Sequence, residues 1–137
     1  MPRIVNVAAA VLIDSAGYVL VAQRPEGKSL AGLWEFPGGK LETNETPEVA
    51  MIRELREELG ITVTPSSLRP LTFVSHAYRE FHLVMLVYLC RAWLGEPLGF
   101  LDQPVRWCTL DELVTLPMPP ADRPVLAALA KALTATA

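Results

Sequence analysis

The sequence predicts an α/β fold in which a mixed β-sheet is flanked by helices. Strand-like segments, one amphipathic helix, further strands and a closing helix follow one another along the chain. Residues 81–90 are almost all apolar, which is typical of a strand buried on both faces in the middle of a sheet. The chain has 137 residues, 51% of them hydrophobic and 20% charged. These values predict one folded domain over residues 1–137.

The first third of the chain is predicted to contain strands joined by tight turns. Residues 4–13 are typical of a buried strand, residues 14–17 of a hairpin turn, and residues 18–22 of the returning strand. Residues 34–41 follow a polar loop and contain Pro37-Gly38-Gly39. Such a backbone must turn sharply and can approach a ligand closely.

Residues 46–60 have the pattern of a capped amphipathic helix. Thr46 is a good N-cap, Pro47 suits the first helical position and Gly60 is a typical terminator. On a helical wheel, one stripe is apolar and consists of Ile52, Leu55 and Leu59, with Val49 at its edge.

The second half of the chain is predicted to contain three strands and two helical segments. The strands are residues 71–75, 81–90 and 107–108, and the helical segments are residues 111–114 and 122–133.

The charge and apolar pattern exclude several classes of partner. Twelve basic and fifteen acidic residues give a net charge of −3, which argues against binding to a nucleic acid duplex. No apolar run approaches the roughly 18 residues that span a membrane. Cys90 and Cys108 stand in apolar surroundings without metal-ligand spacing. We therefore expect buried free thiols and a reducing cytoplasm.

The acidic residues are concentrated in one part of the chain. Seven of the fifteen lie between residues 35 and 58: Glu35, Glu42, Glu45, Glu48, Glu54, Glu57 and Glu58. The last three are neighbours on the predicted helix and repel one another by a few tenths of a kcal/mol per pair. Arg53 and Arg56 offset part of this repulsion, and Mg²⁺ would offset it more completely. The alternative is a solvated helix face.

The spacing of these residues matches a known motif. Reading from Gly39, the chain has five residues, Glu45, seven residues and then the run Arg53-Glu54-Leu55-Arg56-Glu57-Glu58-Leu59-Gly60-Ile61. This fills every defined position of the Nudix box, so the sequence resembles the Nudix hydrolases. Four further segments are similar to the MutT branch, whose members hydrolyse 8-oxo-dGTP: residues 19–24, 33–40, 93–97 and 119–125. The resemblance implies a Nudix-type α/β/α sandwich with a mixed sheet and the Nudix loop-helix.

The resemblance also implies a reaction. Nudix enzymes use Mg²⁺, for which Mn²⁺ can substitute, in the attack of water on phosphorus. A MutT-like member would convert a (deoxy)nucleoside triphosphate, such as 8-oxo-dGTP, to the monophosphate and pyrophosphate. We expect a free nucleotide as the partner of a monomeric, cytoplasmic enzyme with no membrane association. The alternatives are a pyrimidine triphosphate or ADP-ribose as substrate, or a non-catalytic module that binds nucleotide or DNA.

Residue roles follow from the resemblance position by position. Glu57 and Glu58 are implied metal ligands, together with the carbonyl of Gly38. Glu54 is implied as a ligand or as the general base. Arg53 would orient Glu54 and Glu57. Glu45 would brace the turn into the helix, and Asp102 is a further candidate ligand, whose alternative is an ordinary loop aspartate.

Four residues are candidates for substrate binding. Asp122 stands where the MutT pattern has a polar purine reader, and its carboxylate could accept two hydrogen bonds from a guanine edge. The alternative for Asp122 is the N-cap of the last helix. Arg24, Phe36 and Lys40 are candidates for phosphate or base contact. For Phe36, a place in the core is the alternative to stacking.

Overall fold

The computed structural model describes residues 3–99 and 103–135. Its central sheet has four strands in the order β4-β1-β6-β5. They are β1 (Arg3–Leu12), β4 (Gly38–Lys40), β5 (Leu68–Ala77) and β6 (Phe81–Cys90). Strands β1 and β6 run parallel, whereas β4 and β5 are antiparallel to their neighbours. The sheet is therefore mixed, and the apolar strand predicted at 81–90 is central in it.

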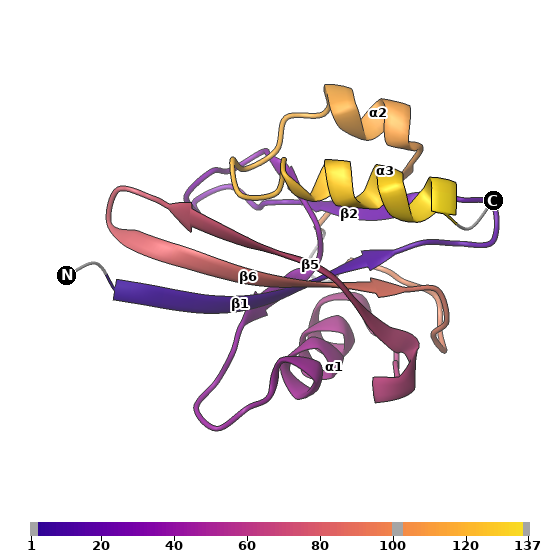
Figure 1. Cartoon of the computed structure of the whole chain (residues 1–137), viewed down its shortest axis with the longest axis horizontal. Helices are drawn as coiled ribbons and strands as arrows, with labels where there is room; N and C mark the ends of the chain where they lie inside the picture. Colours follow the sequence, from indigo (N-terminus) through magenta and orange to yellow (C-terminus); the bar gives the residue numbers. More distant parts are fainter. Residues whose placement is uncertain (1–2, 100–102, 136–137) are drawn as a thin grey trace.

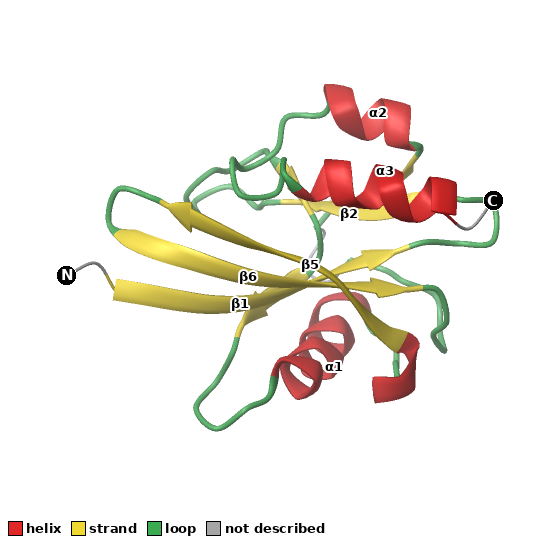
Figure 2. Cartoon of the chain, viewed as in Figure 1, coloured by secondary structure: helices red, strands yellow, loops and turns green. Residues whose placement is uncertain are grey.

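The other elements lie on the two sides of this sheet (Figures 1 and 2). One side carries helix α1 (Pro47–Leu59). The other side carries α2, α3 and the strand β2 of a smaller three-stranded sheet, whose order is β3-β2-β7. The bounds are β2 (Val19–Gln23), β3 (Trp34–Glu35), β7 (Val105–Cys108), α2 (Leu110–Thr115) and α3 (Val125–Ala135), and a 3₁₀ turn, η1, covers Pro65–Ser67. The predicted mixed sheet between helices is confirmed.

Strand β1 is apolar on both faces because it separates two cores. Alternate side chains of a strand point to opposite faces. Ala8, Ala10 and Leu12 belong to the core on the α1 side, and Ala9 and Val11 belong to the core on the α3 side. The apolar run over residues 7–13 follows from this arrangement. The first part of the strand is less buried, and Ile4 is 62% exposed, so the predicted burial of residues 4–13 is wrong at its N-terminal end.

Helix α1 begins and ends where predicted, but its buried face includes different residues at one edge. Thr46 Oγ1 accepts the Val49 N–H at 3.2 Å, and Gly60 ends the helix at a φ of 70°. The buried side is formed by Ala50, Met51, Leu55 and Leu59. Val49 is 52% exposed, so its predicted place at the apolar edge is wrong. The face in contact with the sheet is centred nearer to Met51, which the small alanines of β1 accommodate.

Other differences concern element boundaries. Strand β5 covers ten residues rather than five and contains a bulge between Pro70 and Thr72. Helix α3 begins at Val125 rather than at 122, because a turn precedes it in which the Asp122 carbonyl accepts the Val125 N–H. Cys90 and Cys108 are buried free thiols, as predicted. None of the helices in the described ranges combines the length and apolarity needed to cross a bilayer.

Candidate functional site

Two glycines of β4 lie directly under the carboxylates of α1. Gly38 and Gly39 pair with Ala9 and Ala8 of β1 in an antiparallel ladder. A Cβ atom on Gly39 would collide with the carboxylate of Glu54, and one on Gly38 would collide with the backbone of β1. The end of a helix side chain thus occupies the space next to Gly39, whereas rigid backbone occupies the space next to Gly38.

Glu58 joins the end of α1 to the same strand. Its Oε2 accepts the Gly38 N–H at 3.0 Å. Burial raises the pKa of Glu58 to about 8, and the nearby charges of Glu54, Glu35 and Glu57 add to this rise. The site therefore concentrates negative charge that the protein compensates only in part.

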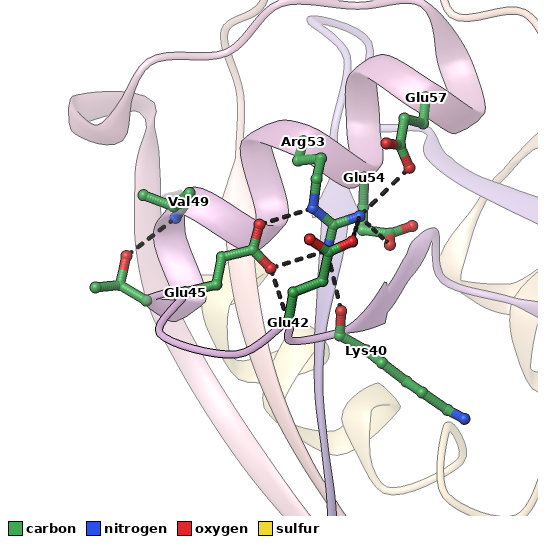
Figure 3. Close-up of polar contacts among 8 residues, drawn as sticks. Lys40, Glu42, Glu45, Val49, Arg53, Glu54 and Glu57 are labelled. Atoms are coloured by element: carbon green, nitrogen blue, oxygen red, sulfur yellow. Dashed lines mark hydrogen bonds and ion pairs between the residues drawn. The ribbon is translucent and has the colours of Figure 1, made fainter.

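Arg53 is the main internal compensation for this charge (Figure 3). It donates to both carboxylate oxygens of Glu45, from Nε at 2.7 Å and from Nη2 at 2.9 Å. Nη1 donates to Glu54 at 2.8 Å and to Glu57 at 3.3 Å, and Nη2 also donates to the Lys40 carbonyl at 3.1 Å. One guanidinium thus connects two candidate ligands with the loop that precedes the helix. Its hydrogen bonds are also the main cause that lowers the pKa of Glu45 to about 2.

The donors at this end of the sheet fit a hard divalent cation. Glu54, Glu57 and Glu58 supply carboxylate oxygens, which Mg²⁺ prefers, and Mg²⁺ keeps several of its waters when bound. Burial is the main cause of the raised pKa of Glu58, and the negative charges of Glu54, Glu35 and Glu57 add to it. In residues 3–99 and 103–135, no three acidic, histidine or cysteine side chains are arranged so that they could hold a metal ion as they stand. The Glu57 side chain is 61% exposed and is turned toward Arg53.

Gly38 is a predicted metal ligand through its carbonyl oxygen, and its N–H donates to Glu58 Oε2. The role of the carbonyl stays a prediction. Asp102 lies outside the described residues.

A second polar group lies on the α3 side of the sheet around Asp122. This aspartate is 6% exposed, and its Oδ2 accepts the Phe36 N–H at 3.0 Å. Burial raises its pKa to about 7, partly opposed by the Phe36 hydrogen bond. Asp122 stands three residues before the first residue of α3, and its carboxylate reaches back to the segment that leads into β4.

The other predicted substrate residues have different surroundings. Phe36 is 3% exposed and belongs to the core on the α3 side, which favours the core alternative over stacking of its ring on a base. Arg24 forms an ion pair with Glu35 at 3.1 Å and donates from Nε to the Ser29 carbonyl at 2.8 Å. The exposed Lys40 lines an open hollow together with Arg3, and its side chain extends away from the Arg53 cluster (Figure 3).

Two residues near the α1 carboxylates and Asp122, Glu35 and Tyr78, were not among the predicted site residues. Glu35 pairs with Arg24, and its charge raises the pKa values of both Glu58 and Asp122. Tyr78 accepts the Ala121 N–H on its hydroxyl at 3.2 Å, next to Asp122. The pairing of Ala22 with Glu35 across β2 and β3 would have suggested the first contact. No local pattern signals the second.

Comparisons with known proteins agree with this arrangement. The NUDIX domain family model matches residues 8–128. The 8-oxo-dGTP diphosphatase of Proteus vulgaris is 46% identical over 91 residues, which are 66% of this chain and 80% of that protein. The enzyme of the same name from Escherichia coli is 35% identical over 124 residues, covering 90% of this chain and 95% of its own.

Two further similarities involve other proteins of Escherichia coli. A CTP pyrophosphohydrolase is 38% identical over 131 residues, covering 92% of this chain and 91% of its own. The solution structure of the ORF135 protein superposes with a TM-score of 0.84 at 32% identity, covering 98% of this chain and 94% of that one. The family match spans most of the chain and includes the whole loop and helix that carry the carboxylates. The chain therefore belongs to the NUDIX domain family.

Proposed function

We propose that this protein is a Mg²⁺-dependent pyrophosphohydrolase that converts a (deoxy)nucleoside triphosphate to the monophosphate and pyrophosphate. An oxidised guanine nucleotide such as 8-oxo-dGTP is the proposed substrate. The observation that carries the proposal is the arrangement of the α1 carboxylates: Glu54 lies against Gly39, Glu58 accepts the Gly38 N–H, and Arg53 donates to Glu54 and Glu57. Two relatives named 8-oxo-dGTP diphosphatase support the choice of substrate.

Each carboxylate has a proposed task. Glu57, Glu58 and the carbonyl of Gly38 would hold the metal, with Asp102 as a further ligand. Glu54 would share in this binding or accept the proton of the attacking water. Hydrolases of this family use a divalent cation in general, and bound Mg²⁺ would supply charge neutralisation for the phosphate oxygens. Mn²⁺ prefers similar oxygen ligands and is the proposed substitute.

Arg53 is a proposed positioning residue. Its two bonds to Glu45 fix the guanidinium on the loop before α1, and the remaining bonds then orient Glu54 and Glu57. Such a planar fork loses little conformational freedom when it binds several carboxylates. Arg53 would thereby orient Glu54 before substrate binds, whichever of its two proposed tasks Glu54 performs.

Base recognition is proposed for Asp122, with Arg24 and Lys40 contacting other parts of the nucleotide. The ionised carboxylate can accept hydrogen bonds from the N1–H and N2–H₂ groups of guanine. The Phe36 N–H holds one carboxylate oxygen in place, so Phe36 contributes through its backbone rather than its ring.

Hydrolysis of a pyrimidine triphosphate is a second candidate function. A carboxylate can also accept a hydrogen bond from the N4 amino group of cytosine. The similarity to a CTP pyrophosphohydrolase, over nine tenths of both chains, favours this candidate.

A substrate panel distinguishes these candidates. Purified protein with Mg²⁺ is incubated with 8-oxo-dGTP, dGTP, CTP, dCTP and ADP-ribose, and the nucleotide products and pyrophosphate are quantified. The first proposal predicts the highest kcat/KM for 8-oxo-dGTP, with pyrophosphate as the second product. Preference for CTP would transfer the assignment to the second candidate, and turnover of none would refute both.

A further inference from the structure

A buried tyrosine ties the carboxylate-bearing helix to the middle of the central sheet. Tyr88 lies on β6 and is 6% exposed. Its hydroxyl donates a hydrogen bond of 2.6 Å to Oε2 of Glu48, in the first turn of α1. This distance is typical of a strong bond between a hydroxyl and a charged carboxylate.

The protonation of the pair is stable around neutral pH. Burial, with Glu48 adding to it, raises the pKa of Tyr88 to about 12. The hydrogen bond from Tyr88 is the main cause that lowers the pKa of Glu48. Tyr88 therefore keeps its proton while Glu48 keeps its charge, and the bond persists over the working range of an enzyme.

Apolar packing alone does not define how α1 sits on the sheet. The helix buries Ala50, Met51 and Leu55 against a core that includes the small side chains of Ala8 and Ala10. Hydrophobic burial is non-directional, so it defines the rotation and axial position of the helix less sharply than a directional contact does. Hydrogen bonds depend steeply on angle and distance, and therefore fix the position more sharply.

The directional contacts hold α1 at its two ends on two different strands. Glu58, in the last turn, binds the Gly38 N–H of β4. Glu48 stands ten residues earlier, about 15 Å along the axis at about 1.5 Å per residue. Among the residues described, Glu48 makes the only side-chain hydrogen bond from α1 to β6. Arg53, in the middle of the helix, also donates to the Lys40 carbonyl of β4. Without the Glu48 bond, the side-chain hydrogen bonds from α1 to the sheet among the described residues would therefore all go to β4, and the helix could pivot about that one strand.

We propose that Tyr88 and Glu48 are a positioning pair that sets the orientation of α1 and so the placement of Glu54 and Glu57 over β4. The pair acts on metal affinity and on kcat through these carboxylates and is not itself catalytic. This inference rests on the function proposed above.

The test removes only the hydroxyl, with Tyr88→Phe. Without nucleotide, Mn²⁺ binding measured by electron paramagnetic resonance is expected to weaken about tenfold, a magnitude known for groups that support metal ligands. With nucleotide, kcat is expected to fall about tenfold because the carboxylates are misplaced, with KM within about twofold. Glu48→Gln keeps an acceptor and should stay near wild type, whereas Glu48→Ala should reproduce Tyr88→Phe.

Thr109→Ala is the matched control for lost stability. It removes the N-cap hydrogen bond of α2, a helix on the other side of the sheet, and should lower Tm without changing Mn²⁺ affinity. Wild-type Mn²⁺ affinity and kcat in both Tyr88→Phe and Glu48→Ala would overturn the inference. An equal loss of Mn²⁺ affinity in Thr109→Ala would overturn it too, because the effect would then follow stability alone. If the wild type hydrolyses no nucleotide, the proposed function fails, and Mn²⁺ binding still decides for or against the pair.

Discussion

The carboxylate of Glu54 occupies the space where Gly39 would carry a side chain. The helix and the glycine strand thus fit each other at the point where the candidate ligands gather. Gly38, one residue earlier, has backbone atoms of β1 in the corresponding place. Substitutions at these two adjacent glycines therefore distinguish an effect on the candidate site from an effect on the stability of the fold.

Gly39→Ala is expected to lose activity while the protein stays folded. The new Cβ would push the flexible end of Glu54 aside, which costs little stability but misplaces a group near the reacting atoms. We expect kcat to fall about 100-fold, as for small misplacements in other active sites. Gly38→Ala is the contrasting variant, because its Cβ meets the rigid backbone of Ala8 and should lower Tm markedly. Unchanged kcat in a folded Gly39→Ala protein would contradict the placement of Glu54.

Arg53→Lys tests the guanidinium as a positioning group. Lysine keeps the charge but cannot reach Glu45, Glu54 and Glu57 at once. We expect kcat to fall by about 10- to 100-fold, as with other supporting groups of metal sites. The control is Arg56→Lys, since Arg56 is exposed on the same helix. Steady-state kinetics measures kcat for both variants. Equal kcat values for Arg53→Lys and Arg56→Lys would contradict the positioning role of Arg53.

The stability of the metal-free protein is expected to decrease as pH rises from about 4 to about 7. Asp122 has a pKa of about 7 in the folded state, against an ordinary value of 3.8. The folded state therefore binds more protons than the unfolded state between these values, and stability falls as pH rises through them. Glu58 acts in the same direction up to about pH 8.

Urea unfolding in the presence of EDTA, repeated from pH 5 to pH 9, measures this dependence. Asp122→Asn should flatten the slope below pH 7, because the amide does not titrate. A free energy of unfolding of the wild type that rises from pH 5 to pH 7 would contradict the burial of Asp122.

Mg²⁺ should stabilise the folded protein. A ligand that binds only the folded state at ten times its dissociation constant adds about 1.4 kcal/mol. Thermal unfolding with and without Mg²⁺ should show that Mg²⁺ raises the Tm of the wild type, and raises the Tm of Glu57→Gln by less. Equal rises in the two proteins would remove Glu57 from the metal site.

Much of the site could be predicted from local sequence because it is built from one loop and one helix. The spacing from Gly39 to Gly60 indicated the helix ends, the three carboxylates and the contact from Arg53, all of which lie within one short segment. Capping and helical periodicity are local properties, so they can be read without a fold.

The parts that could not be predicted depend on contacts between distant segments. Asp122 and Phe36 are 86 residues apart, and Tyr88 and Glu48 are 40 apart. The exposure of Val49 depends on how the helix is rotated on the sheet, which a helical wheel does not show. Phe36 looked equally suited to stacking and to the core, and only packing could decide between them.

The most direct test of the central claim compares hydrolysis of 8-oxo-dGTP by the wild type and by Glu57→Gln at saturating Mg²⁺. We expect the wild type to release 8-oxo-dGMP and pyrophosphate. In the variant we expect kcat to fall at least about 100-fold, with an unchanged circular dichroism spectrum. Equal turnover by the two folded proteins would contradict the metal site on α1, and no turnover by the wild type would contradict the proposed substrate.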